Sequence, residues 1–252
     1  MAYTTAVKRF CLLFAVSLVL QVELAAIGKE DGFRQERLAL VEVIQADVRR
    51  TSSHLDRESL DERVLDAMRE VPRHLFVPPD SRAEAYENRP LAIGHGQTIS
   101  QPYIVAIMTD LLKPKGDHRV LEVGTGSGYQ AAVMAKLVSE VFSMEIVEPL
   151  GLQARQRLQQ LGYDKVQVRI GDGYYGWEEH APFDSIIVTA AASHVPPPLV
   201  KQLKPGGRMI IPVGSAFMVQ QLVLIEKGMD GEVTLKQILP VRFVPLTGEH
   251  GG

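Results

Sequence analysis

The chain of 252 residues contains one cysteine, Cys11, which lies in an apolar N-terminal segment. Intramolecular disulfides and cysteine-rich zinc sites need several thiols, so both are excluded. The seven histidines do not have the spacing of metal ligands, so we expect no metal site. Long blocks of one charge are also missing and the net charge is −3, so the composition gives no sign of a nucleic-acid-binding surface.

Residues 1–27 differ in composition from the rest of the chain. Lys8 and Arg9 precede an uncharged apolar run over residues 10–22, and small residues follow it. This is the composition of a secretory signal peptide, and the run is too short for a membrane-spanning helix. Two interpretations stay open: export through residues 1–26, or a wrongly assigned start codon in front of a cytoplasmic protein.

The N-terminal part of the chain, residues 34–112, is predicted to be mostly helical. Apolar residues recur at helical spacing over 38–50. Ser59 and Glu62 form a capping box for a second helix. Ser100 is expected to cap a third helix that runs to about residue 112, after a glycine-bearing loop over 91–100.

From residue 119 the pattern changes to alternating strands and helices, which predicts an α/β fold. Such alternation favours a mostly parallel sheet with helices on both faces. Two further strands around a Gly/Asp turn predict an antiparallel pair at the C-terminus. We expect a single domain over 34–252, with strands at 119–123, 140–145, 166–170, 183–189 and 207–212, helices at 127–138, 149–161 and 196–203, and the antiparallel pair at 218–226 and 232–239.

The most informative segment is the glycine-rich loop after the first of these strands. Glycines stand at alternate positions, Gly124, Gly126 and Gly128, with Thr125 and Ser127 between them. Glycine lets a backbone turn tightly and approach a ligand closely. A dinucleotide-binding loop would need its third glycine one residue later, where this chain has tyrosine, so the loop fits a pyrophosphate poorly.

With Glu122 in front of the glycines, the loop resembles that of S-adenosylmethionine-dependent methyltransferases. In that resemblance Glu122 faces the positive part of the cofactor, and Glu145, at the end of the next strand, accepts bonds from the ribose hydroxyls. Asp172 would bond the adenine amino group, with Gly173 giving the ring room. Thr189 follows another strand at the same edge. A solvated loop acid at Glu145 and a plain turn aspartate at Asp172 are the alternatives.

An ordered set of motifs is similar to the protein-L-isoaspartate O-methyltransferase family. The matching segments lie at 71–77, 94–103, 121–130, 171–173, 181–191 and 241–246. The resemblance implies a Rossmann-like methyltransferase that transfers a methyl group from S-adenosylmethionine to the α-carboxylate of L-isoaspartyl residues. That esterification initiates the repair of damaged proteins and peptides. The N-terminal apolar extension and His95 depart from the family pattern.

The implied chemistry needs no general base, because an α-carboxylate with a pKa of about 3.5 is already ionised at neutral pH. A donor for that carboxylate is needed, and a dry pocket helps since opposite charges disappear in the reaction. By resemblance Ser100 is the active-site serine, and Thr98 is the second candidate. Helix capping is the alternative role of Ser100. Arg242 fits either the substrate carboxylate or a structural salt bridge.

Three other functions remain possible at this stage. They are methylation of a small-molecule carboxyl or hydroxyl group, nicotinamide-dependent oxidoreduction, and S-adenosylmethionine binding or secreted interaction without catalysis. If the chain methylates isoaspartyl residues, we expect isoaspartyl proteins and peptides as its partners. We expect no nucleic-acid partner, no stable membrane span and a monomer. We expect a cytoplasmic location, because the methyl donor is made in the cytosol.

Overall fold

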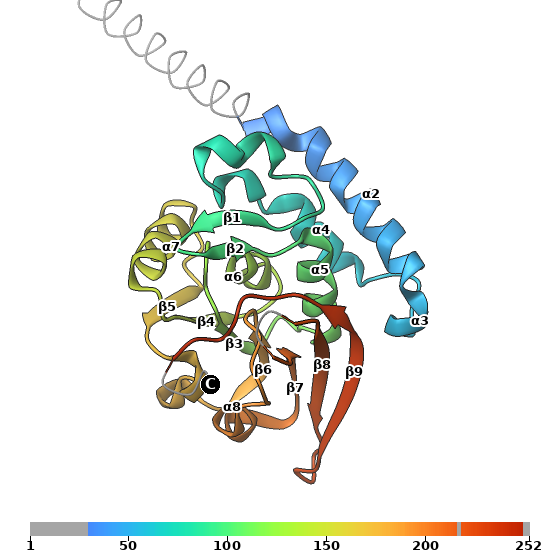
Figure 1. The fold of residues 1–252 in the computed structure, drawn as a ribbon, viewed down its shortest axis with the longest axis vertical. Helices are drawn as coiled ribbons and strands as arrows, with labels where there is room; N and C mark the ends of the chain where they lie inside the picture. Colours follow the sequence, from blue (N-terminus) through green and yellow to red (C-terminus); the bar gives the residue numbers. More distant parts are fainter. Residues whose placement is uncertain (1–29, 216–217, 249–252) are drawn as a thin grey trace, which may run out of the picture.

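The structure is a computed structural model that describes residues 30–215 and 218–248 (Figure 1). The signal-like segment 1–27 lies outside the described residues. Among the described helices, none combines the length and the apolar character that crossing a bilayer requires.

A seven-stranded sheet forms the centre of the molecule, in the order β5-β4-β3-β6-β7-β8-β9. Its first five strands are parallel, whereas β8 pairs antiparallel with both β7 and β9. This confirms the predicted mostly parallel sheet with a C-terminal antiparallel pair. The strands are β3 (Arg119–Val123), β4 (Glu140–Glu145), β5 (Val166–Ile170), β6 (Phe183–Val188), β7 (Leu203–Val213), β8 (Gln220–Lys227) and β9 (Val233–Val241).

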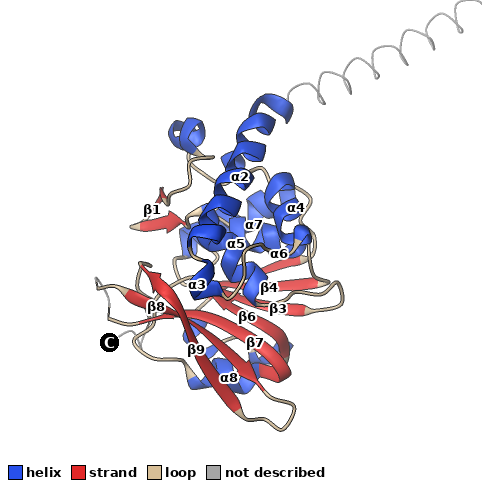
Figure 2. Ribbon diagram, turned by 90° about the vertical axis from the view of Figure 1, so that its right-hand side faces the viewer, coloured by secondary structure: helices blue, strands red, loops and turns tan. Residues whose placement is uncertain are grey.

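Helices cover both faces of this sheet (Figure 2). Neighbouring residues of one strand point to opposite faces, so Val120 and Leu121 belong to two separate buried clusters. The helices drawn above the sheet in Figure 2 are α2 (Arg34–Arg50), α4 (Glu62–Glu70), α5 (Pro102–Leu111), α6 (Tyr129–Ala135) and α7 (Glu148–Gln160), and α8 (Pro197–Gln202) lies below it.

The shorter elements lie in the connections. They are α3 (Ser52–Leu55) and the 3-10 turns η1 (Glu30–Phe33), η2 (Arg73–Leu75), η3 (Pro79–Glu84), η4 (Gly173–Tyr175) and η5 (Glu178–His180).

Two predicted helix caps are wrong. Helix α4 is capped by Asp61, whose side chain accepts a bond from the Arg63 N–H at 2.9 Å, and not by Ser59. Aspartate is itself a strong capping residue, and it stands closer to the helix. Helix α5 begins at Pro102, so its N-cap residue is Gln101 and not Ser100. The Gln101 side chain makes no cap bond within the described chain. Ser100 therefore lies outside the helix.

The predicted loop over 91–100 is an antiparallel hairpin instead. Strands β1 (Leu91–Gly94) and β2 (Gln97–Ile99) pair around a turn in which Gly94, His95 and Gly96 all have positive φ, of 92, 52 and 70°. Two glycines make that turn possible. The hairpin pairs Ala92 with Thr98.

Candidate active site

A cavity opens where β3 and β6 lie side by side, at the carboxyl ends of the parallel strands. The chain leaves these two neighbours in opposite directions along the sheet, which is the topological switch point where α/β folds bind ligands. We call this space the main cavity. Its wall includes Val123–Ser127, Met144–Val147, Gly173, Thr189, Ala190, the hairpin residues 97–100 and the C-terminal residues 244–247.

The glycine-rich loop is held in place by the Thr189 hydroxyl and by the Met144 carbonyl oxygen of β4. Gly124 has φ of +100°, and a Cβ there would come within 2.5 Å of the Thr189 hydroxyl oxygen. That hydroxyl donates to the Gly124 carbonyl oxygen at 2.7 Å, while the N–H groups of Gly124 and Thr125 donate to Met144 O at 2.8 and 3.1 Å. The close approach explains why residue 124 is a glycine.

The end of the loop turns into helix α6. Gly126, Thr125 and Ser127 line the main cavity, whereas Gly128 is the N-cap of α6 with φ of +87° and packs against Leu158. The helix begins at Tyr129, later than predicted, because the residue before it has a left-handed conformation. Gly128 thus shapes the turn without lining the cavity.

Glu145 is the one charged residue among the described residues that line the main cavity. Its side chain is 5% exposed, and its two carboxylate oxygens accept bonds from the N–H groups of Gly126 at 2.7 Å and Val147 at 2.9 Å. Each oxygen keeps a further lone pair for a ligand. Because no described lysine or arginine lines the cavity beside Glu145, the cavity suits hydroxyl or positively charged groups better than a pyrophosphate.

Asp172 follows β5 at the same edge of the sheet. Its Oδ1 accepts a bond from the Tyr174 N–H at 2.9 Å, but its Oδ2 is buried and has no partner among the described residues. Gly173, which lines the main cavity, packs so closely on Val123 that a Cβ would lie 2.4 Å from a methyl carbon. A buried oxygen without a partner fits a ligand that donates a hydrogen bond.

Glu122 lies beneath the loop and not on the cavity wall. Its Oε2 accepts a bond from the Ser143 hydroxyl, which also bonds Thr125 Oγ1 at 2.6 Å, whereas its Oε1 has no partner in the described part of the chain. Burial raises the pKa of this carboxyl to about 8. The residue is therefore placed to act on a ligand through Ser143 and Thr125, and not by direct contact.

Ser100 and Thr98 stand between the main cavity and a second depression, which we call the outer groove. Both residues line both spaces, as do Thr189 and Val244. The outer groove is otherwise mostly apolar; its remaining lining residues are Pro90, Gln101, Ile104, Val219, Pro240, Val241, Arg242 and Phe243. A molecule seated in the groove would meet a ligand of the main cavity at these hydroxyl-bearing side chains.

Arg242 is exposed and supplies the one charge of the outer groove among the described residues. None of the ion pairs between described residues involves it, so the structural salt bridge considered for it is not formed in this part of the chain.

The C-terminal tail forms a wall of the main cavity that the sequence did not predict. Residues 244–247 line it, and the tail is fixed by two backbone bonds with Ala191, from Ala191 N to Val244 O at 2.8 Å and from Leu246 N to Ala191 O at 2.7 Å. The motif at 241–246 was visible in the sequence, but nothing there indicated that it crosses the sheet edge.

These features fit S-adenosylmethionine. The glycine-rich loop admits a close ligand, Glu145 has a carboxylate for hydroxyl groups, and Asp172 has an acceptor oxygen without a partner among the described residues. Among the described residues, no group of three or more His, Cys, Asp or Glu side chains is arranged to hold a metal ion.

Comparison with known proteins places the chain in a family. The profile of protein-L-isoaspartate(D-aspartate) O-methyltransferases matches residues 52–251. Protein-L-isoaspartate O-methyltransferase 2 of Polaromonas sp. is 69% identical over 211 residues, covering 84% of this chain and all of its own. The enzyme of the same name from Syntrophobacter fumaroxidans is 59% identical over 240 residues, covering 94% and 97% of the two chains.

Solved structures agree with this assignment. A protein-L-isoaspartate O-methyltransferase with 29% identity superposes with a TM-score of 0.74, covering 85% of this chain and 67% of its own. A putative enzyme of this kind from Plasmodium falciparum, in complex with S-adenosyl-L-homocysteine, has 27% identity and a TM-score of 0.65, with coverages of 81% and 97%. This chain belongs to the protein-L-isoaspartate(D-aspartate) O-methyltransferase family.

Proposed function

We propose that the chain transfers the methyl group of S-adenosylmethionine to the α-carboxylate of L-isoaspartyl residues, with Ser100 and Thr98 holding the acceptor. One observation carries this assignment of roles: both residues lie where the main cavity meets the outer groove. The cofactor occupies the main cavity and the damaged peptide occupies the groove.

The reaction needs alignment and exclusion of water more than proton transfer. The cofactor supplies a methyl group on a positively charged sulfur. The acceptor carboxylate is ionised at neutral pH, since its intrinsic pKa is about 3.5, so no residue has to remove a proton. The Ser100 hydroxyl donates to this carboxylate and fixes its direction, with Thr98 beside it. The apolar wall of the outer groove limits the access of water to the reacting oxygen.

The remaining polar residues hold the cofactor. Glu145 accepts bonds from the ribose hydroxyls, and Asp172 Oδ2 accepts one from the adenine amino group. Thr189 acts indirectly, because its hydroxyl keeps Gly124 in the conformation that leaves room for the ligand. Glu122 also acts indirectly, through Ser143 and Thr125.

The activity is tested by methyl transfer from labelled S-adenosylmethionine to an L-isoaspartyl peptide, with the matching aspartyl peptide as control. We expect label in the first peptide and none in the second. Equal labelling of both would refute the proposal. The small-molecule alternative has no support, since the relatives that match most of the chain are named for protein isoaspartate.

The chain is further proposed to act as a monomer in the cytoplasm, where its cofactor is made. Light scattering would give the oligomeric state. N-terminal sequencing of the protein from fractionated cells would test the location, and a mature N-terminus just after residue 26 in an exported fraction would contradict it.

A further inference from the structure

The side chain of Asn88 lies outside the outer groove and links two chain segments that line it. Pro90 belongs to one segment, and Gln101 and Ile104 belong to the other. Asn88 lies beside the first segment and bonds to the second. We propose that Asn88 is a positioning residue that fixes the place of Ser100 against the acceptor, an inference that depends on the proposed methylation of isoaspartyl residues.

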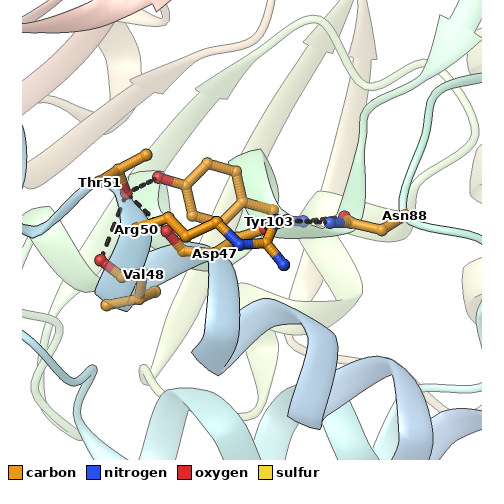
Figure 3. A network of polar contacts seen from close by, with 6 residues as sticks. All are labelled: Asp47, Val48, Arg50, Thr51, Asn88 and Tyr103. Carbon is orange, nitrogen blue, oxygen red and sulfur yellow. Dashed lines mark hydrogen bonds and ion pairs between the residues drawn. The ribbon is translucent and has the colours of Figure 1, made fainter.

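Both ends of the Asn88 amide are engaged. Its Oδ1 accepts a bond from the Tyr103 N–H at 3.0 Å, and its Nδ2 donates to Asp47 Oδ2 at 2.6 Å (Figure 3). A backbone N–H only donates and a carboxylate oxygen accepts, so an amide in this orientation serves both partners at once. Asn88 thereby satisfies one N–H group in the first turn of α5. Among the described residues, the cap residue Gln101 makes no such side-chain bond.

A second bond holds the same residue of α5. The Thr51 hydroxyl donates to the Asp47 carbonyl oxygen at 2.8 Å, so it accepts from the Tyr103 hydroxyl, at 2.5 Å. Figure 3 shows Tyr103 held through its backbone by Asn88 and through its ring by Thr51. The first turn of α5 is thus tied to the end of α2 on two sides.

This attachment lies close to the reacting groups in sequence but outside the cofactor site. Ser100 precedes the first turn of α5, and the Gln101–Pro102 link leaves little freedom between Ser100 and Tyr103. None of Asp47, Asn88 and Tyr103 lines the main cavity. Loss of the Asn88 bonds should therefore displace the acceptor side of the site and leave cofactor binding intact.

The test uses three variants and one control in the full chain. Asn88→Ala removes both bonds. Asn88→Asp keeps an acceptor for the Tyr103 N–H but places a carboxylate against the Asp47 carboxylate. In the double variant Asn88→Asp/Asp47→Asn, residue 47 becomes the donor and residue 88 the acceptor, so the bond between them is restored. Arg50→Ala is the control, since it removes only a surface ion pair to Asp47 from an arginine whose side chain is 74% exposed.

We expect kcat/KM for an isoaspartyl peptide to fall about tenfold in both single variants, through KM more than kcat, while the Kd for S-adenosylhomocysteine stays within about twofold. The double variant should recover most of the loss, and the control should match the wild type. Unchanged kinetics in the single variants, an equal loss of cofactor affinity, or no recovery in the double variant would overturn the role of Asn88. A wild type that does not methylate the peptide would overturn the proposed function and this inference together.

Discussion

At the scale of single residues, the site separates into groups that touch ligands and groups that support them. Ser100 and Thr98 belong to the first kind, because they face both the main cavity and the outer groove. Glu122 belongs to the second kind, because it is buried under the loop. The distinction gives different expectations for their substitution.

Replacing Ser100 by alanine should slow the reaction without changing the affinity for the cofactor. The hydroxyl is proposed to donate to a charged acceptor, and losing such a bond lowers kcat/KM by roughly ten- to a hundredfold. Steady-state kinetics with an isoaspartyl peptide and calorimetric titration of S-adenosylhomocysteine separate the two effects. Ser53→Ala, at an exposed position of α3, is the matched control. Wild-type kinetics in Ser100→Ala would remove this residue from the mechanism.

Replacing Asp172 by alanine should weaken the cofactor complex. The unpaired Oδ2 is the proposed acceptor for the adenine amino group, and losing that partner costs roughly 1–3 kcal/mol of binding free energy. The Kd for S-adenosylhomocysteine measures it, with the exposed Asp164→Ala as control. An unaltered Kd would leave Asp172 with its turn bond to the Tyr174 N–H as its whole role.

Glu122 should make the stability of the fold depend on pH. Burial raises the pKa of its carboxyl from the usual 4.5 to about 8. Between these two pH values the folded chain keeps a proton that the unfolded chain releases. The stability that this proton contributes is complete below about pH 4.5 and is lost as the pH rises to about 8. The free energy of unfolding should fall across this window by at most about 1.4 kcal/mol per pH unit.

The variant Glu122→Gln cannot ionise, so it should show a flatter pH dependence. Urea unfolding of both proteins at several values between about pH 5 and about pH 8 gives the comparison. Identical slopes would mean that the Glu122 carboxyl titrates normally in the folded chain.

At the scale of elements, the sequence predicted best what depends on local pattern. The strands around the glycine-rich loop follow from apolar runs, and the position of Glu145 follows from the length of one strand-helix-strand unit. The hairpin over 91–99 was missed because its strands are short and its turn has three residues with positive φ in a row. The cap of α4 was misplaced because Ser59 and Asp61 are both good capping residues.

The loop after β3 should tolerate no side chain at its first glycine. In Gly124→Ala the new Cβ would meet the Thr189 hydroxyl oxygen at 2.5 Å, and φ of +100° is strained for alanine. That hydroxyl cannot retreat without losing its bond to the Gly124 carbonyl oxygen. We expect the Kd for S-adenosylhomocysteine to rise at least about tenfold. Gly116→Ala is the matched control, since its Cβ would meet no atom within 4 Å; equal Kd values in the two variants would show that the loop adapts.

At the scale of the whole molecule, the site combines three segments that are far apart in the sequence. The hairpin, the strand ends and the C-terminal tail meet at the main cavity. Figure 1 shows the tail, in red, running back from the end of β9 across the sheet toward the β5 side. Sequence patterns report short-range order, so they indicated each segment but not this meeting.

The tail should control how long the cofactor stays bound. It is fixed to Ala191 by two backbone bonds, and a Cβ at Gly248 would come within 2.4 Å of Asp172 Oδ2, so Gly248 lies against the proposed adenine site. Leu246→Pro removes the N–H that donates to Ala191 O, which frees this part of the tail.

We expect the dissociation rate of S-adenosylhomocysteine from Leu246→Pro to rise several-fold, because the freed tail no longer closes the main cavity. Stopped-flow displacement measures the rate. Leu246→Ala is the control that separates the two contributions of this residue, since it trims the side chain but keeps the backbone donor. If the alanine variant releases the ligand as fast as the proline variant, side-chain packing and not the backbone bond holds the tail over the cavity. If both release it at the wild-type rate, the tail does not govern cofactor exchange.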